Sequence, residues 1–238
     1  MAGHSKWANI KHRKARQDAK RSKIWSKCSR AIIVAAKHGG GDPDQNLTLR
    51  YAVDEAKAAN MPKDTIAKAI EKGAGGSDGD DYEEVVYEGY GPAGVAVYVE
   101  TLTDNRNRTV PELRKMFEKC GGNLASAGSV AFTFERKGEL FVDGAKADEE
   151  KIMDVVLEAG AEDVEDADGA WRITTAVEDF HRVRAALEAA GLTPDQAGLP
   201  MLPLNVVELD GEQAEKTERF LDELDDHDDV QKVYANNA

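Results

Sequence analysis

The sequence has no run of about 18 apolar residues, the length that a helix needs to cross a bilayer. It also lacks an apolar N-terminal segment followed by a small-residue cleavage site, so nothing in it indicates a secretory signal. Patterned sequence begins almost at Met1, which is not typical of a mitochondrial presequence. We therefore expect a soluble, cytoplasmic protein with no membrane partner.

Cysteine is scarce: the chain has only Cys28 and Cys120, far apart in the sequence. Metal sites use Cys or His in pairs at short spacing, and neither cysteine has such a partner. His4 and His12 also lack Cys or acidic partners. We expect two reduced thiols and no bound metal.

Motifs for catalysis are missing as well. The chain has no Gly-x-Ser-x-Gly nucleophile motif, and no Gly-Lys-Ser/Thr follows its glycine-rich segment at residues 73–81. That segment is better interpreted as an acidic linker than as a phosphate-binding loop. We expect a non-enzymatic protein with no cofactor and no small-molecule substrate.

Net positive charge is confined to the N-terminal third of the chain. Residues 1–76 hold 16 Lys and Arg against 7 Asp and Glu, a net charge of +9. Residues 77–238 hold 15 against 38, a net charge of −23. A basic block that neutralises phosphates releases counterions, which drives sequence-independent binding to nucleic acid. The asymmetry predicts nucleic acid as the partner, directed to the N-terminal end by the acidic remainder.

The first 37 residues concentrate this signal, with 11 bases and one acid, Asp18. A charged tail is often only solvated, but bases interleaved with an aromatic ring suit single-stranded or looped nucleic acid. Residues 1–16 are expected to form a basic arm in which Trp7 stacks on a base or anchors the arm. The candidate nucleic-acid contacts are Lys6, Trp7, Lys11, His12, Arg13, Lys14, Arg16, Lys20, Arg21, Lys23, Lys27 and Arg30.

Helical periodicity dominates the rest of the basic region. Over residues 17–38 an apolar stripe lies beside a cationic one, which predicts a helix with a core face and a charged face. A second helix is predicted over residues 46–59. A third follows the start signal at Pro62 and is expected to stop at the glycines of residues 73–76.

Strands and helices alternate after residue 81. Residues 139–204 have the order β-α-β-β-α-β, which is typical of a ferredoxin-like domain. The flanking segments form a second such unit only if residues 82–135 join residues 205–238. There we predict strands at 95–100, 129–135, 205–209 and 230–234, a helix from the capping box at Thr109 to Lys119, and a helix over 212–224.

The predicted fold is therefore α+β. An N-terminal three-helix domain (residues 1–76) precedes two ferredoxin-like α+β domains, one inserted in the other. The split domain comprises residues 82–135 and 205–238, and the inserted domain comprises residues 136–204.

Two further polar segments are candidates for function. Asn105, Arg106, Asn107 and Arg108 lie between a strand and a helix, and they form either a second contact, to RNA or to a protein partner, or a polar loop with a helix cap. An acidic run near the C-terminus lacks the spacing and central Gly of a calcium loop, so we expect a solvated face. Its members are Asp222, Glu223, Asp225, Asp226, Asp228 and Asp229.

Several motifs resemble a known family. They are residues 2–14 (Ala-Gly-His-Ser-Lys-Trp-Ala-Asn-Ile-Lys-His-Arg-Lys), 87–92 (Tyr-Glu-Gly-Tyr-Gly-Pro), 102–109 (Leu-Thr-Asp-Asn-Arg-Asn-Arg-Thr) and 228–234 (Asp-Asp-Val-Gln-Lys-Val-Tyr). Together they resemble the YebC/PmpR family, whose mitochondrial relative is the translational activator of cytochrome c oxidase.

The resemblance implies a three-domain protein that is cytoplasmic in bacteria. Members are described as DNA-binding transcriptional regulators, and others as translation factors that act on the ribosome. Two functions therefore stay open: a regulator that binds promoter DNA, and a ribosome-associated factor that binds ribosomal RNA near the peptidyl-transfer region.

Overall fold

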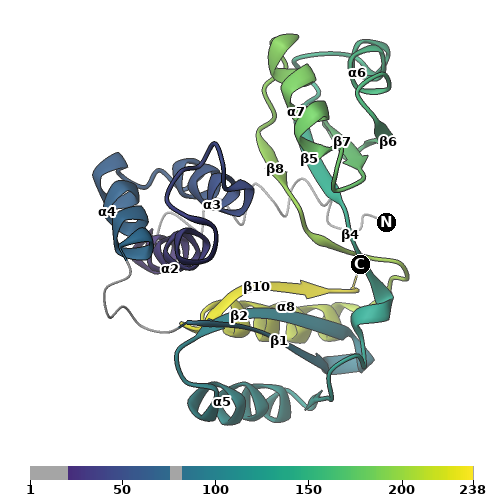
Figure 1. Cartoon of the computed structure of the whole chain (residues 1–238). Coiled ribbons are helices and arrows are strands. Elements are labelled where there is room, and N and C mark those ends of the chain that lie inside the picture. The colour runs from purple at the N-terminus through teal and green to yellow at the C-terminus, as the bar shows by residue number, and fades with distance from the viewer. Residues whose placement is uncertain (1–20, 76–81, 238) are drawn as a thin grey trace. The chain divides into compact units, whose positions relative to one another are not determined.

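The computed structural model of the chain describes residues 21–75 and 82–237 (Figure 1). These residues form two compact units. The smaller comprises residues 132–207, and the larger comprises residues 21–75, 82–131 and 208–237. Helices and strands are mixed in the order that confirms the α+β class. Within the described ranges, no helix has the length and apolar character needed to cross a membrane.

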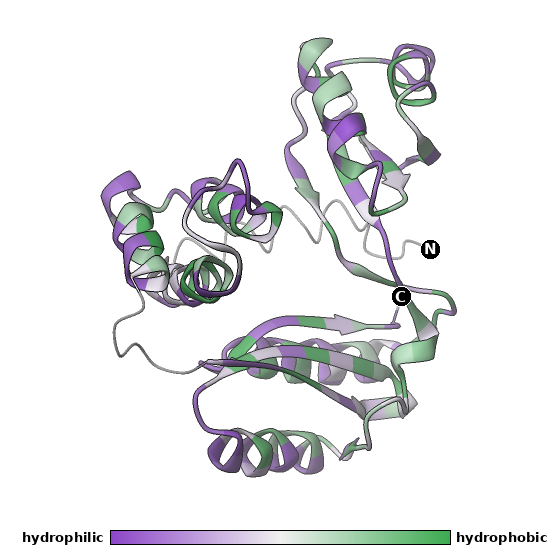
Figure 2. Ribbon diagram, in the orientation of Figure 1, coloured by the Kyte–Doolittle hydropathy of each residue, from purple (hydrophilic) through white to green (hydrophobic). Residues whose placement is uncertain are grey.

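The described part of the basic region, residues 21–75, forms a bundle of three helices with its own core. Ile32, Leu49 and Ile66, one from each helix, are almost fully buried in that core. In Figure 2 the residues of the third helix alternate between apolar and polar, as expected of a helix with one buried face. The helices are α2 (Arg21–Gly39), α3 (Leu47–Ala58) and α4 (Lys63–Ala74).

The glycine-rich residues 73–76 end the third helix, as predicted, although Gly73 itself lies within the helix. Helix α4 continues to Ala74, and Gly75 is its C-cap. Gly73 is buried against α2, where an added Cβ would clash with the Ile33 carbonyl oxygen and lie 2.8 Å from the Ala36 Cβ. The glycine therefore permits close packing of two helices rather than marking a helix end.

The larger unit also contains a four-stranded antiparallel sheet in the order β10-β2-β1-β3. Strand β10 comes from the far end of the chain and pairs along β2, from Val230 opposite Thr101 to Ala235 opposite Val97. The two segments that flank the insertion thus share one sheet. The strands are β1 (Glu83–Tyr90), β2 (Ala96–Thr103), β3 (Asn123–Leu124) and β10 (Val230–Ala235).

Helices α5 (Arg106–Lys119) and α8 (Gly211–Asp225) pack together against this sheet. The rings of Phe117 and Phe220, one from each helix, meet edge to face with centroids 4.9 Å apart, and both are fully buried. Edge-to-face pairs add to the stabilisation that burial of the rings provides. These rings form the centre of the core between the helices and the sheet.

The smaller unit confirms the ferredoxin-like order predicted for residues 139–204. Its antiparallel sheet has the order β6-β7-β5-β8, and a separate two-stranded ribbon pairs β4 (Phe134–Arg136) with β9 (Met201–Pro203). The elements of the main unit are β5 (Gly138–Asp143), α6 (Glu149–Val156), β6 (Ala161–Asp166), β7 (Ala170–Thr175), α7 (Phe180–Ala189) and β8 (Gln196–Gly198).

The two four-stranded sheets have equivalent strand positions, but the strands occupy these positions in a different order along the chain. When β10-β2-β1-β3 is matched to β8-β5-β7-β6, strand β1 takes the place of β7. The strand predicted at residues 205–209 does not form, and β1, absent from the prediction, fills that place. Three glutamates, a glycine and two adjacent valines interrupt the apolar–polar alternation of β1. Its pairing with β2, rather than its own sequence pattern, therefore identifies it as a strand.

The start of α5 was also predicted wrongly. The helix begins at Arg106 because the Asn105 side chain, as N-cap, accepts a hydrogen bond from the Arg108 N–H at 3.2 Å. Thr109, expected to cap the helix, is instead buried inside it. The strand predicted at residues 129–135 is a 3₁₀ turn, Ala131–Thr133, followed by the short β4.

Replacing Gly73 by Ala is expected to lower the free energy of unfolding of the helical bundle by about 1–3 kcal/mol, because the new methyl group overpacks the contact with α2. Gly211, the first residue of α8, is the matched control, since a Cβ there meets no heavy atom within 4 Å. Urea unfolding followed by circular dichroism measures both variants. Equal stability of the two would show that α2 and α4 do not require glycine at residue 73.

Candidate nucleic-acid interface

Three of the predicted nucleic-acid contacts have side chains that the structure describes: Lys23, Lys27 and Arg30 on α2. Their spacing of four and three residues places them along one side of the helix, here named the cation row. Residues Ile32 and Ala36 of the same helix are buried in the bundle core. Outside the described residues lie the candidates Lys6, Trp7, Lys11, His12, Arg13, Lys14, Arg16 and Lys20, and only the backbone of Arg21 is described.

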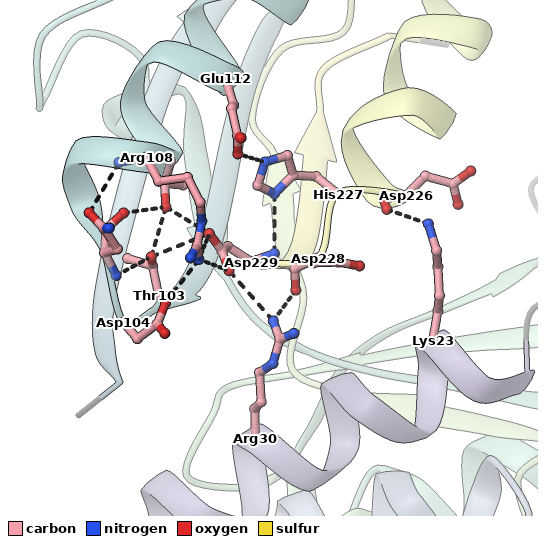
Figure 3. A network of polar contacts seen from close by, with 12 residues as sticks. Lys23, Arg30, Thr103, Asp104, Arg108, Glu112, Asp226, His227, Asp228 and Asp229 are labelled. Carbon is pink, nitrogen blue, oxygen red and sulfur yellow. Dashed lines mark hydrogen bonds and ion pairs between the residues drawn. The ribbon is translucent and has the colours of Figure 1, made fainter. Parts of the chain in front are cut away.

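The cation row contacts the acidic run near the C-terminus, residues 222–229, here named the acidic segment (Figure 3). The Lys23 Nζ donates to the Asp226 carbonyl oxygen at 2.9 Å. The Lys27 Nζ lies 3.2 Å from the Asp225 Oδ1. The acidic run was expected to form a solvated face. Asp222 and Asp228 are exposed, but the Asp225 carboxylate and the Asp226 carbonyl oxygen instead accept bonds from α2.

Arg30 extends the same contact. Its guanidinium donates to the Asp228 carbonyl oxygen and lies 3.7 Å from the Asp229 carboxylate. It also lies over the Tyr82 ring, 5.7 Å from the centroid. A guanidinium over an aromatic face gains a cation–π attraction in addition to its ion pair.

The position of the acidic segment at the end of α8 strengthens its attraction for cations. Helix α8 ends at Asp225, and Asp226 is its C-cap. The last carbonyls of a helix lack intrahelical partners and carry the negative end of the helix dipole. Lysines that bind these carbonyls therefore satisfy them and stabilise the helix end. The cation row thus meets both formal carboxylate charge and helix-end charge.

Asp229 is the buried anion of the segment, with a side chain only 4% exposed. Its two oxygens accept hydrogen bonds from the Arg108 guanidinium at 2.9 and 2.8 Å. The Thr109 hydroxyl donates to it at 2.8 Å, and the Thr103 hydroxyl lies 3.3 Å away. Burial alone would raise the pKa of Asp229, but the bonds from Arg108 and Thr109 outweigh it and hold the pKa below its usual value.

Several residues of the predicted second contact, residues 105–108, already make bonds within the protein. Asn105 caps α5, and Arg108 bonds Asp104 as well as Asp229, which raises the pKa of its guanidinium. Arg106 pairs with Glu83 at 2.6 Å, and Asn107 is exposed. Contact of these four residues with RNA or a protein partner stays a prediction.

Charges of both signs line a cleft of about 940 Å³ where these groups meet. Near it His227, on the turn after α8, bonds Glu112 of α5 at 2.9 Å. Within residues 21–75 and 82–237, no cluster of His, Cys, Asp or Glu has an arrangement that could hold a metal ion. The lining of the cleft includes Lys23, Arg30, Arg108, Lys115, Lys119 and Asp228.

Comparison with known protein families accounts for nearly the whole chain. Residues 5–76 match the model of the "TACO1/YebC protein N-terminal domain", and residues 82–237 match that of the "TACO1/YebC second and third domain". The chain belongs to the TACO1/YebC family. This confirms the resemblance carried by the sequence motifs.

Relatives at high identity support the assignment. A "Probable transcriptional regulatory protein" from Syntrophotalea carbinolica is 57% identical over 99% of this chain and 95% of its own length. One of the same name from Paracidovorax citrulli is 56% identical over the full length of both chains. A crystal structure of a conserved hypothetical protein from Aquifex aeolicus is 44% identical, with a TM-score of 0.83 over 94% of this chain and 93% of that chain.

Replacing Asp229 by Asn is expected to lower the free energy of unfolding by about 2 kcal/mol near neutral pH, because charge-assisted bonds to a buried group are lost. The folded-state pKa of Asp229 lies below its unfolded value of about 3.9. Its contribution is therefore complete above that unfolded value and is lost as pH falls through the folded value.

Urea unfolding at a series of pH values measures this effect. The stability difference between the wild type and Asp229→Asn should stay constant above about pH 5 and shrink as the pH falls below about 4. The control is Asp228→Asn, since Asp228 is exposed and bonds Arg30 through its carbonyl oxygen. A difference that is independent of pH would contradict the role given to the Asp229 carboxylate.

Proposed function

We propose that this member of the TACO1/YebC family is a non-enzymatic regulator of gene expression that binds nucleic acid through its basic N-terminal region. Promoter DNA is the first candidate partner. The basic arm and the cation row of α2 contact phosphate, and the acidic remainder of the chain stays away from the polymer.

The two-sided character of α2 carries this proposal. One side of the helix is buried in the bundle core, while Lys23, Lys27 and Arg30 lie together outside that core. A helix held by its apolar side presents its cations in a fixed row, which reduces the entropy lost on binding. The row continues the basic arm of the preceding residues, so the first 37 residues supply 11 cations to one end of the chain.

Names of the relatives agree with a role in gene expression. Those from Syntrophotalea carbinolica and Paracidovorax citrulli are named as probable transcriptional regulatory proteins, and they align over nearly their full lengths. Counterion release from DNA explains how a chain with a net charge of −14 can bind it, because the local charge of the arm decides the contact.

The sequence of α2 favours a second candidate, a ribosome-associated translation factor that binds ribosomal RNA. The helix has no Asn or Gln, the side chains that read adenine edges in a DNA groove, and its described cation row contains two lysines and one arginine. Such a row suits contact with phosphates, which positions a protein without reading sequence. Structured RNA in a crowded site needs only that kind of contact.

Replacing Lys6, Lys11, Arg13 and Lys14 by Ala is expected to abolish binding to nucleic acid at near-physiological salt while the α+β domains stay folded. If the wild type neutralises roughly six phosphates, its log affinity should fall with log salt at a slope of about −4 to −5. Loss of four cations should reduce the magnitude of that slope by about 3. Fluorescence anisotropy with labelled DNA and RNA over a salt series measures both quantities.

The matched control removes the same charge from exposed positions outside the basic region: Arg114, Lys151, Lys216 and Arg219, each changed to Ala. Unchanged binding by the arm variant, or equal loss in both variants, would contradict the proposal. Point substitutions are preferable to deleting residues 1–37, because α2 forms part of the bundle core and its removal would unfold the bundle.

Crosslinking in cells followed by sequencing of the bound nucleic acid separates the two candidates. A promoter regulator should recover defined DNA sites and should prefer them over scrambled DNA at about 0.15 M salt. A ribosome-associated factor should recover ribosomal RNA and should sediment with ribosomes in a sucrose gradient.

A further inference from the structure

Lys23, Lys27 and Arg30, the described cations assigned to phosphate contact, already bond carbonyl and carboxylate oxygens of the same chain. Lys23 and Lys27 bond the end of α8, and Arg30 bonds the turn that follows. One amine or guanidinium cannot make its full set of contacts with both a phosphate and this segment. Binding of nucleic acid to the cation row therefore requires these contacts to open.

The acidic segment resembles a nucleic-acid backbone in its chemistry. Within residues 222–229 it has six carboxylates, and the carbonyls at the end of α8 add partial negative charge. The cations it meets recur at about one per helical turn, an axial spacing of about 5–6 Å. The segment thus offers a line of anionic oxygens to a line of cations, as a phosphate backbone would.

We infer that the acidic segment is an intramolecular competitor that covers the cation row and that nucleic acid must displace it. The inference rests on the proposed function and gives its regulation. The closed state, with the row on the segment, lowers the affinity for nucleic acid, and only polymers that contact the arm and the row together open it.

The segment keeps its place without help from α2, which makes it a competitor rather than a part of the bundle. Asp229 is bound by Arg108 and Thr109, and His227 is bound by Glu112, all of them residues of α5. Helix α2 in turn packs in its own core with α3 and α4. Both surfaces therefore stay folded when they separate.

The contacts that close the row are weak enough for a polyanion to displace. Lys23 is exposed, and the Asp225 side chain that pairs with Lys27 is 41% exposed, whereas the side chains of Lys27 and Arg30 are 16% and 20% exposed. Exposed ion pairs contribute little because water and salt screen them. Nucleic acid, which releases counterions when it binds, outcompetes such pairs at low salt.

The test removes three negative charges from beside the cation row while preserving the backbone of the segment, with Asp225→Asn, Asp226→Asn and Asp228→Asn combined. Asp225 pairs with Lys27 through its carboxylate, whereas Asp226 and Asp228 bond α2 through carbonyl oxygens, so changing these two weakens only the longer-range attraction. Acids at a helix C-terminus oppose the dipole, so these changes should not destabilise α8. Asp229 stays unchanged because it anchors the segment. We expect the affinity for a short labelled DNA duplex and for single-stranded RNA to rise about threefold to tenfold at about 0.1 M salt.

A control variant separates competition from a general change in net charge. It carries Glu150→Gln, Asp154→Asn and Glu158→Gln, exposed acids of the smaller unit, and changes the net charge by the same amount. Its affinity should rise by less than about twofold, since distant exposed charges are screened. An equal gain in affinity in the two variants would contradict competition by the acidic segment, and it would not affect the proposed function.

A second measurement needs no nucleic acid. Cys28 on α2 is half-buried against the bundle core, and this burial raises the pKa of its thiol to about 11. It directly follows Lys27, which bonds Asp225, so opening of the row should increase the access of reagents to the thiol. With Cys120 changed to Ser in every protein, alkylation of Cys28 should be at least about threefold faster in the neutralised variant than in the wild type or the control. Equal rates would overturn the inference.

The two measurements distinguish the possible failures. Faster alkylation with unchanged affinity would overturn the competitor alone, because opening the row would then not affect binding. Absence of binding to DNA and RNA by every protein at low salt would overturn the proposed function, and the regulatory role would fall with it. Faster alkylation together with the selective gain in affinity supports both.

Discussion

The carboxylate of Asp229 is the point at which four elements of the larger unit meet. It follows α8, accepts bonds from Arg108 and Thr109 of α5, lies near Thr103 of β2, and pairs with Arg30 of α2. A charge that is 4% exposed is tolerated only where donors replace the lost water. The start of α5 and the end of α8 are therefore constrained to lie where these donors can reach one carboxylate.

Helix α2 makes two different sets of contacts, one on each side of the helix. Its apolar side completes the bundle core, and its cation row contacts the acidic segment. Cations in a folded protein with excess acid find carboxylates of the same chain unless geometry prevents it. The strong charge asymmetry of the sequence thus gives the chain an affinity for itself, alongside the proposed affinity for nucleic acid. Under that proposal, salt and the length of the polyanion decide which contact prevails, because both are electrostatic.

The local sequence pattern predicted an element correctly where the periodicity of its own residues marks it as a helix or a strand. The periodicity of residues 46–59 and 212–224 predicted α3 and α8, and the alternation of elements over residues 139–204 predicted the ferredoxin-like order. The local pattern was not sufficient where contact with a distant segment of the chain determines the local structure. Strand β1 has poor alternation of its own and forms because β2 pairs along its whole length. The glycines of residues 73–76 end α4 as predicted, but only the fold shows that Gly73 also permits the close packing of α4 on α2.

The sequence by itself determined the class of the fold, the basic N-terminal region, the family and the identity of the charged groups, because these depend on composition, short-range periodicity and motifs. Only the tertiary structure decided that β1 completes the split sheet, that Asp229 rather than any of its acidic neighbours is buried, and that the acidic segment covers Lys23, Lys27 and Arg30. The partners of Asp229 in α5 lie more than 100 residues away along the chain, so no local signal marks it. The composition gives the number and sign of the charged side chains, whereas only the tertiary fold determines which of them come into contact.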